Sequence, residues 1–310
     1  MRWFIILIFL NVTLSVFAQE QYSLIPDTQL SGTGKGYSLS FPIDLMVMEN
    51  ELYVLDQTSG IIYVFDAASL TPDRKFGGLG SQPVEFSKAM SICADGNGNL
   101  AVSDYSNDRI QIISPYGEFL GEITQIYPWR LSNNSGELYA DLFPGIPEAG
   151  IYVIDNNELA QVVDLGRFFE KENFKSILEK YYSWCATDWG FVLSFSGRDE
   201  VVIFNRNGKK KRNRVEPLPF SMPNTLYGKP CAWQDGFLLL GTANDHSMAD
   251  TTQTKINYEG FLGYYTQKGE LEKIYKLPAD VWLADAWTLE GDKVYLYDSV
   301  RMIVNRFRLD

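Results

Sequence analysis

Histidine and cysteine, the side chains that most often ligate metals or act as nucleophiles, are scarce in this chain of 310 residues. His246 is the single histidine, so no cluster of histidine ligands can form and any nucleophilic triad would depend on this residue. It lies beside Asp245 in a long polar segment, which favours a solvated loop histidine and makes His246 a weak catalytic candidate. We expect no cofactor and no metal site.

The segment from Ala89 to Ile123 shows which elements would have to position any functional group. Three alternating apolar runs and a fourth, FLGEI, are separated by Gly, Asn, Asp and Pro, which predicts a four-stranded antiparallel meander. One such sheet cannot bury both of its faces, so copies are expected elsewhere. Second strands of this type recur about every 48 residues, beginning at Glu51, Asn99, Glu137, Phe191, Phe237 and Lys293. The sequence therefore predicts an all-β six-bladed β-propeller of four-stranded antiparallel blades.

Three segments depart from the repeat. The sixth unit reaches Asp310 after only three strands, so we predict that the N-terminal segment Tyr22 to Ile25, continuing to Leu30, pairs with the last blade and closes the ring. Apolar residues at helical spacing predict one short amphipathic helix over Arg167 to Tyr181, between blades three and four. The stretch Ala243 to Glu259 is a polar insertion between strands two and three of blade five.

The best-preserved unit resembles an NHL repeat. GNLAVSDYSNDRIQIISPYGEFL, beginning at Gly98, has a small-residue strand ending in Asp, then N-x-R-I and a turn, and FGGLGSQPVEF before it is similar to the link between repeats of that family. In blades three to five the Asp at the end of strand two is lost or displaced. The chain as a whole resembles exported six-bladed propellers of the NHL type common in Bacteroidetes-like bacteria, many of which have no assigned activity.

The N-terminus indicates export, and the overall charge limits the class of partner. Residues 1–18 have a basic start, an apolar run and a small-residue end, which predicts a secretory signal peptide followed by a single propeller domain over residues 19–310. An uncleaved N-terminal anchor is the alternative; we expect no transmembrane segment in the mature chain. The net charge of −12 disfavours nucleic acid as a partner. The basic run Lys209 to Arg214 is interpreted as protection of an outer strand edge.

The irregular segments are predicted to gather on one face. In a four-stranded blade, the loop between strands two and three and the link to the next blade emerge at the same end, here called the loop face. The insertion in blade five, the Pro144 to Gly150 stretch, the Gly77 to Lys88 link and the predicted helix all belong to it. This face is the candidate binding surface.

Alignment of the innermost strands places a set of mixed charge near the channel mouth: Asp44, Ser91, Arg130, Ser183, Lys229, and either Asp285 or Ala286. A calcium site would need converging oxygen ligands, and Arg130 and Lys229 would repel the cation. The set fits an anionic or zwitterionic ligand, or a water-filled channel. Trp129 and Trp282 either expose rings for stacking on a sugar or peptide, or pack between blades.

The three cysteines are predicted to be buried free thiols. Cys93, Cys185 and Cys231 each fall two residues after the aligned channel position of their own blade. Neighbouring sheets stack about 10 Å apart, whereas a disulfide needs Cα atoms within about 7 Å. Neither a disulfide framework nor a metal site is expected from them.

Two functions remain open. The first is an exported, non-catalytic binding or scaffold propeller in the periplasm or outside the cell, a monomer that recognises a peptide, glycan or envelope protein partner on the loop face. The alternative is a hydrolase or lyase acting on a small envelope or extracellular substrate, with His246, Asp44 or Asp285 as acid and base. An enzyme needs converging titratable groups with perturbed pKa values, and the sequence shows only scattered ones.

Overall fold

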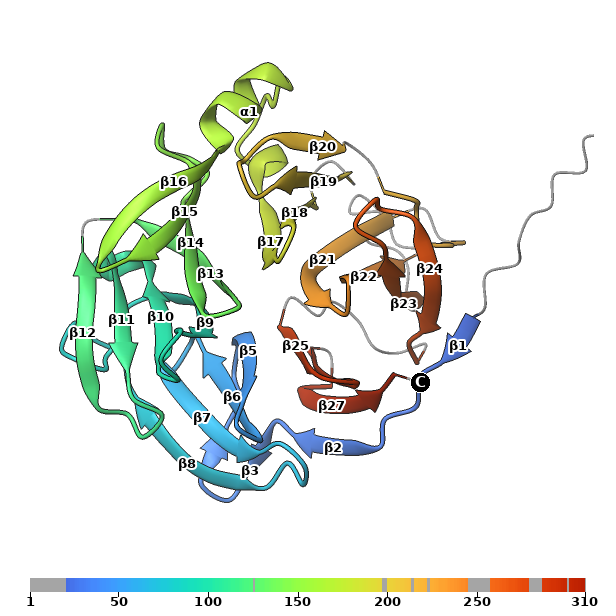
Figure 1. Ribbon diagram of the computed structural model, residues 1–310. Helices are drawn as coiled ribbons and strands as arrows, with labels where there is room; N and C mark the ends of the chain where they lie inside the picture. Colours follow the sequence, from blue (N-terminus) through green and yellow to red (C-terminus); the bar gives the residue numbers. More distant parts are fainter. Residues whose placement is uncertain are drawn as a thin grey trace, which may run out of the picture.

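The computed structural model describes residues 21–124, 126–196, 200–212, 215–221, 224–244, 257–278, 286–299 and 301–309. Its strands form six antiparallel blades around a central axis, with one short α-helix at the rim (Figure 1). The predicted six-bladed β-propeller is therefore confirmed. No helix among these residues is both long and apolar enough to cross a bilayer. The predicted signal peptide lies outside the described residues.

The first three blades run from the inner to the outer strand in chain order. Blade one comprises β5 (Pro42–Met48), β6 (Glu51–Asp56), β7 (Ile61–Asp66) and β8 (Pro72–Gly77). Blade two comprises β9 (Ala89–Ala94), β10 (Leu100–Asp104), β11 (Arg109–Ile113) and β12 (Phe119–Thr124). Blade three comprises β13 (Pro128–Asn134), β14 (Glu137–Leu142), β15 (Gly150–Asp155) and β16 (Glu158–Asp164).

The other three blades follow the same plan, except that the last takes its outer strand from the N-terminus. Blade four comprises β17 (Tyr182–Thr187), β18 (Gly190–Phe195), β19 (Glu200–Asn205) and β20 (Lys210–Arg212). Blade five comprises β21 (Asn224–Trp233), β22 (Gly236–Asn244), β23 (Tyr258–Tyr265) and β24 (Leu271–Lys276). Blade six comprises β25 (Trp287–Glu290), β26 (Lys293–Asp298) and β27 (Ile303–Arg308).

The core lies between neighbouring blades. Middle strands such as β6 are buried along most of their length, because each blade is covered on both faces. One apolar cluster joins blades three and four, where the Tyr139 and Phe191 rings lie 5.3 Å apart edge to face. Trp184 and Trp287 are fully buried, as the interpretation of tryptophans as interblade wedges predicts.

The N-terminal segment closes the ring, but in two pieces. β2 (Thr28–Ser31) pairs antiparallel with β27 and completes blade six, as predicted. The prediction is wrong for the preceding residues, because β1 (Gln21–Ser23) pairs in parallel with β24 of blade five. Pro26 lies between the two strands and cannot continue a ladder. Leu24 fills the apolar cluster between blades five and six, which holds the crossing in place. A short hairpin, β3 (Thr33–Gly34) and β4 (Tyr37–Ser38), follows β2.

A helix does lie between blades three and four, but its predicted extent is wrong. α1 spans Leu165–Lys171, and only a 3₁₀ turn at Leu178–Lys180 follows. The Asp164 side chain caps α1 by accepting the Arg167 amide hydrogen at 2.8 Å. Asn173 adopts a left-handed φ of 57°, which ends the helical course two residues past α1.

Two further predictions concern blades four and five. Lys210 to Arg212 of the basic run form β20 on the outer edge of blade four, as predicted, and Lys210 forms an ion pair with Glu172 just after α1. Residues 213 and 214 of the run lie outside the described residues. In blade five, the polar insertion separates β22 from β23. Residues 245–256 of this insertion, including His246, lie outside the described residues.

Candidate functional site

Three residues predicted at the channel mouth meet inside the channel. Lys229 Nζ in β21 lies 2.8 Å from Asp44 Oδ1 in β5, and Ser91 Oγ in β9 donates to Asp44 Oδ2 at 2.7 Å. The Ile92 amide donates to the same carboxylate oxygen at 3.1 Å. Blades one and five are not neighbours in the ring, so this contact spans the channel (Figure 1). We call Asp44, Ser91 and Lys229 the channel throat.

The throat is buried and electrically balanced. The side chain of Lys229 is 15% exposed and that of Asp44 is 1% exposed. Burial lowers the pKa of the Lys229 ammonium, but the adjacent Asp44 carboxylate more than offsets this effect, so the pKa lies above its ordinary value. A ligand would have to break the ion pair to reach Asp44, which argues against Asp44 as a general acid or base.

Within the described part of the chain, the side chains of Arg130 and Ser183 form no hydrogen bond or ion pair with Asp44, Ser91 or Lys229. The Arg130 backbone amide donates to Asp141 Oδ1, while its side-chain Nε is buried without a hydrogen-bond partner. Ser183 is buried in β17. The two remaining channel candidates, Asp285 and Trp282, lie outside the described residues.

Asp141 is a buried carboxyl that the sequence did not single out. Burial raises its pKa to about 7, against the lowering effects of Tyr182, the Arg130 amide and Trp184. Its Oδ2, the Tyr182 hydroxyl and the Trp184 indole nitrogen are all buried without a satisfactory hydrogen bond. Asp141 is fully buried between blades three and four, so substrate cannot touch it in this conformation.

Asp141 is the displaced form of a repeated structural aspartate. In blade one, Asp56 ends β6 and accepts the Ser40 and Phe41 amides at 2.6 and 2.7 Å. In blade two, Asp104 ends β10 and accepts the Ser87 and Lys88 amides in the same way. Each of these two carboxylates ties the start of its own blade to the end of strand two, which assigns them to the scaffold.

Beyond the throat, away from the loop face, the channel holds a cavity of about 240 Å³. The three cysteines line it together with other residues of the innermost strands. All three are free, as predicted, but Cys231 is half-buried rather than buried. Burial raises the pKa of Cys231 to about 12 and raises that of Cys93 further, which disfavours the thiolate forms of both. Among the described residues, no group of His, Cys, Asp or Glu side chains is arranged to hold a metal ion.

An aromatic cluster lies on the loop face beside the channel. Trp129 is at its centre, with the rings of Tyr105, Phe143 and Tyr181 at 5.4, 5.1 and 6.1 Å between centroids. Trp129 itself is only 9% exposed, which corrects the idea that its ring is presented to a ligand. The other three rings are half-buried and form the outer part of the cluster, and Lys88 lies over the Tyr105 ring at 5.7 Å.

Exposed apolar side chains also gather on the loop face. The described residues include ten exposed large hydrophobic side chains. Six of them lie in links or in loops between strands two and three, on the loop face: Phe41, Leu79, Tyr127, Ile177, Leu178 and Met302. More of the exposed large hydrophobic side chains among the described residues therefore lie on the loop face than on the rest of the molecule.

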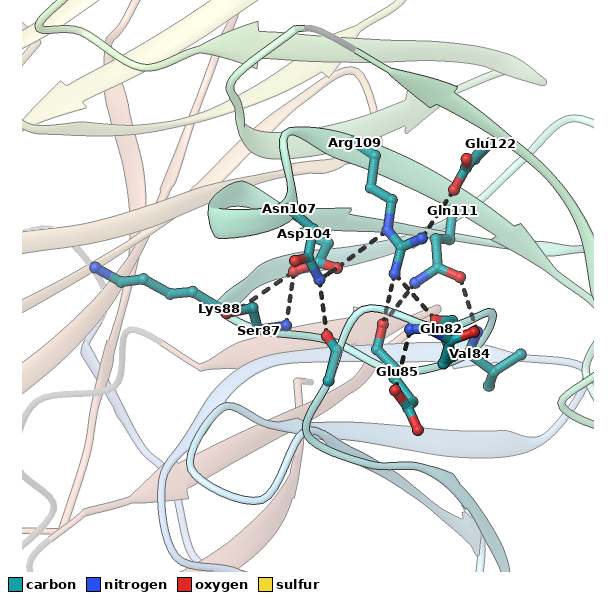
Figure 2. A network of polar contacts seen from close by, with 11 residues as sticks. Gln82, Val84, Glu85, Ser87, Lys88, Asp104, Asn107, Arg109, Gln111 and Glu122 are labelled. Carbon is teal, nitrogen blue, oxygen red and sulfur yellow. Dashed lines mark hydrogen bonds and ion pairs between the residues drawn. The ribbon is translucent and has the colours of Figure 1, made fainter.

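Hydrogen bonds from the strands of blade two hold the Gly77 to Lys88 link on this face, as Figure 2 shows. Arg109 donates to the Gln82 and Glu85 carbonyls at 3.1 and 3.0 Å, and Gln111 donates to the Glu85 carbonyl at 2.8 Å. Asp104 accepts the Ser87 and Lys88 amides. The residues that carry the repeat signature therefore fix the conformation of the link.

Sequence reasoning missed the residues that form the aromatic cluster around Trp129. Tyr105 follows β10, Phe143 follows β14 and Tyr181 precedes β17, so they come from three blades. A signal was present, because each is an aromatic residue directly beside the end of a strand that reaches the loop face.

No protein-family model matches the chain, and no curated protein sequence matches it. The resemblance to NHL repeats therefore stays a prediction. Solved structures do match over most of the chain.

A member of the DUF4221 family from Bacteroides vulgatus is similar with a TM-score of 0.60 and 11% identity, covering 93% of this chain and 98% of that one. A putative exported protein from Bacteroides fragilis is similar with a TM-score of 0.54 and 13% identity, covering 89% and 86%. Virginiamycin B lyase from Staphylococcus aureus is similar with a TM-score of 0.53 and 11% identity, covering 91% and 99%. At this identity the likeness shows the propeller fold alone.

Proposed function

We propose that this protein is an exported, non-catalytic binding or scaffold propeller of a bacterial envelope, of the NHL type, with a signal peptide over residues 1–18 and one domain over residues 19–310. It recognises a peptide, glycan or protein partner on the loop face, in the periplasm or outside the cell. The similarity to a putative exported Bacteroides protein supports the compartment.

The observation that carries the proposal is the apolar and aromatic character of the loop face. The ring edges around Trp129 and exposed residues such as Leu79 offer flat, partly desolvated surface, which suits stacking on a sugar or packing against a peptide. The hydrogen bonds of Asp104, Arg109 and Gln111 hold the Gly77 to Lys88 link in one conformation. Binding of a partner therefore loses little conformational entropy in ordering this link.

A hydrolase or lyase is the second candidate. The likeness to virginiamycin B lyase and the near-neutral pKa of Asp141 favour it. Against it, Asp141 is fully buried and Asp44 is engaged by Lys229. His246, the weak catalytic candidate, lies outside the described residues.

The test begins with a thermal-shift screen of the protein against glycans, peptides, organic acids and divalent metals. A hit is then measured with Leu79→Asp and Tyr181→Ala, and with Tyr116→Ala as the matched control, because Tyr116 is exposed on the opposite end of blade two. We expect the first two variants to lose affinity at least tenfold and the control to bind normally. Turnover of the ligand, or equal binding by all three variants, contradicts the proposal.

A further inference from the structure

The outer strands of a propeller are exposed edges, and this protein protects several of them. β1 covers β24, and β2 covers β27. β8 and β20 carry charged side chains along the edge, in PDRKFG and KKR. Covering strands and charged edges both prevent pairing with another chain.

β12, the outer strand of blade two, has a single charged residue, Glu122, in FLGEIT. It pairs with β11 on one side, and no other described strand covers its outer edge. Phe119 is 39% exposed and Leu120 is 52% exposed, and they are the only exposed large hydrophobic side chains in the described strands. A bulge at the start of β12 is followed by a regular ladder from Gly121 to Thr124.

A groove of about 520 Å³ runs beside β12 toward blade three. Leu120 to Ile123 form one wall, and Leu138, Ile154 and the Asp155 to Asn157 turn form the other. A methyl group added at Gly121 would meet no atom within 4 Å, so space is open over the middle of the strand. The groove is thus bordered by an edge that can accept one more strand.

The charge of the groove selects the occupant. Its walls contain the carboxylates of Asp95 and Asp155 and that of Glu122, which is paired with Arg109, and no Lys or Arg is among the described residues that line it. The chain carries a net charge of −12, which disfavours a second copy of itself at this site. A cationic polypeptide matches both the local and the overall charge.

We propose that β12 and its groove bind an extended basic segment of a partner protein by β-strand addition, with the backbone pairing along Gly121–Thr124. The cationic side chains of alternate residues lie toward the acidic walls, and apolar residues cover Phe119 and Leu120. This surface lies away from the loop face and does not depend on the proposed function.

The test uses the peptide acetyl-KVKVKVKVK-amide, labelled for fluorescence anisotropy, with the purified protein. A form with alternate backbone nitrogens methylated and a form with Glu in place of Lys are the peptide controls. Leu120→Lys places a charge on the edge, and Ser81→Lys adds the same charge at an exposed position of the link. Hydrogen exchange measured by mass spectrometry locates the bound peptide.

We expect the basic peptide to bind the original protein and Ser81→Lys equally, and to slow exchange in Gly121–Thr124. Leu120→Lys should weaken binding about tenfold, or about 1.4 kcal/mol, because it removes an apolar contact and adds a like charge. Equal binding of the methylated or acidic peptide, protection outside β12, or no effect of Leu120→Lys overturns the proposal. So does a protein dimer that Leu120→Lys abolishes, since the edge would then belong to a second copy.

Discussion

Replacement of Asp104 by alanine tests whether the repeat signature holds the blade and its link together. The Asp104 side chain is fully buried. It accepts the Ser87 and Lys88 amides at 3.0 and 3.2 Å, Asn107 Nδ2 at 2.6 Å and Arg109 Nε at 3.3 Å, as Figure 2 shows. Asp104→Ala leaves all four donors without this acceptor.

The expected loss of stability follows from these partners. An unsatisfied buried donor costs about 1–3 kcal/mol, but Arg109 keeps Glu122 and two carbonyls as partners, and water can enter the space left by the carboxylate. Loss of one partner of a buried ion pair costs about 3–5 kcal/mol. We therefore expect Asp104→Ala to lower the free energy of unfolding by about 4 kcal/mol, a large part of the roughly 5–15 kcal/mol typical of a folded domain.

Urea denaturation followed by tryptophan fluorescence measures this loss. With a slope of about 3 kcal/mol per molar, the midpoint should fall by roughly 1–2 M. Asp73→Ala is the control, because Asp73 is a 59% exposed carboxylate paired with Arg74, and surface pairs contribute at most about 1 kcal/mol. Hydrogen exchange in the Gly77 to Lys88 link should rise in the Asp104 variant alone. Equal midpoints of the two variants, or a link that stays protected, would refute the reasoning.

Three further predictions concern the interblade contacts. The folded-state pKa of Asp141, about 7, lies above its unfolded value of 3.8, so the folded state binds the extra proton and stability should fall as the pH rises from about 4 to about 7. At 1.36 kcal/mol per pKa unit, the free energy of unfolding should fall by about 4 kcal/mol over this range, and the fall should be absent from Asp141→Asn. Parallel curves of urea midpoint against pH for the original protein and Asp141→Asn would contradict this prediction. At the throat, Asp44→Ala should lower the free energy of unfolding by about 3–5 kcal/mol, because it leaves the buried Lys229 ammonium without its partner. Lys229→Met should lower it by only about 1–3 kcal/mol, because Asp44 keeps its hydrogen bonds to Ser91 and the backbone. Urea titrations that show the reverse order would contradict this prediction. Arg306 donates to Asp27 and to carbonyls of blade one, so Arg306→Met should cost about 3 kcal/mol and lower the Tm by roughly 6–12 °C in calorimetry; an unchanged Tm would mean that the N-terminal segment does not hold the ring closed.

The sequence predicted the repeat well because each blade is formed by consecutive residues of the chain. Strands, turns and the N-x-R-I signature follow one another within about 35 residues, so their pattern can be read directly. Prediction of α1 failed where apolar spacing continued past Asn173, because Phe174 packs beside Phe168 without belonging to the helix. The pairing of β1 with blade five was missed for a similar reason, since a three-residue strand carries no mark of its partner.

The candidate site was likewise predicted only in its local features. Alignment of the repeats placed Asp44, Ser91 and Lys229 near the channel. The buried ion pair between Asp44 and Lys229, and the hydrogen bond from Ser91, depend on the tertiary structure, because the ion pair joins blades that are not neighbours.

The sequence alone determined the blade, its number of copies and the face on which irregular segments emerge, because hydrophobic period and turn residues act over short distances. Only the tertiary structure decided that Tyr105, Phe143 and Tyr181 surround Trp129, that the throat is neutralised, and that β12 is left uncovered. The first two depend on contacts between segments that are far apart in the chain. The third depends on the fact that no other described strand packs against the outer edge of β12.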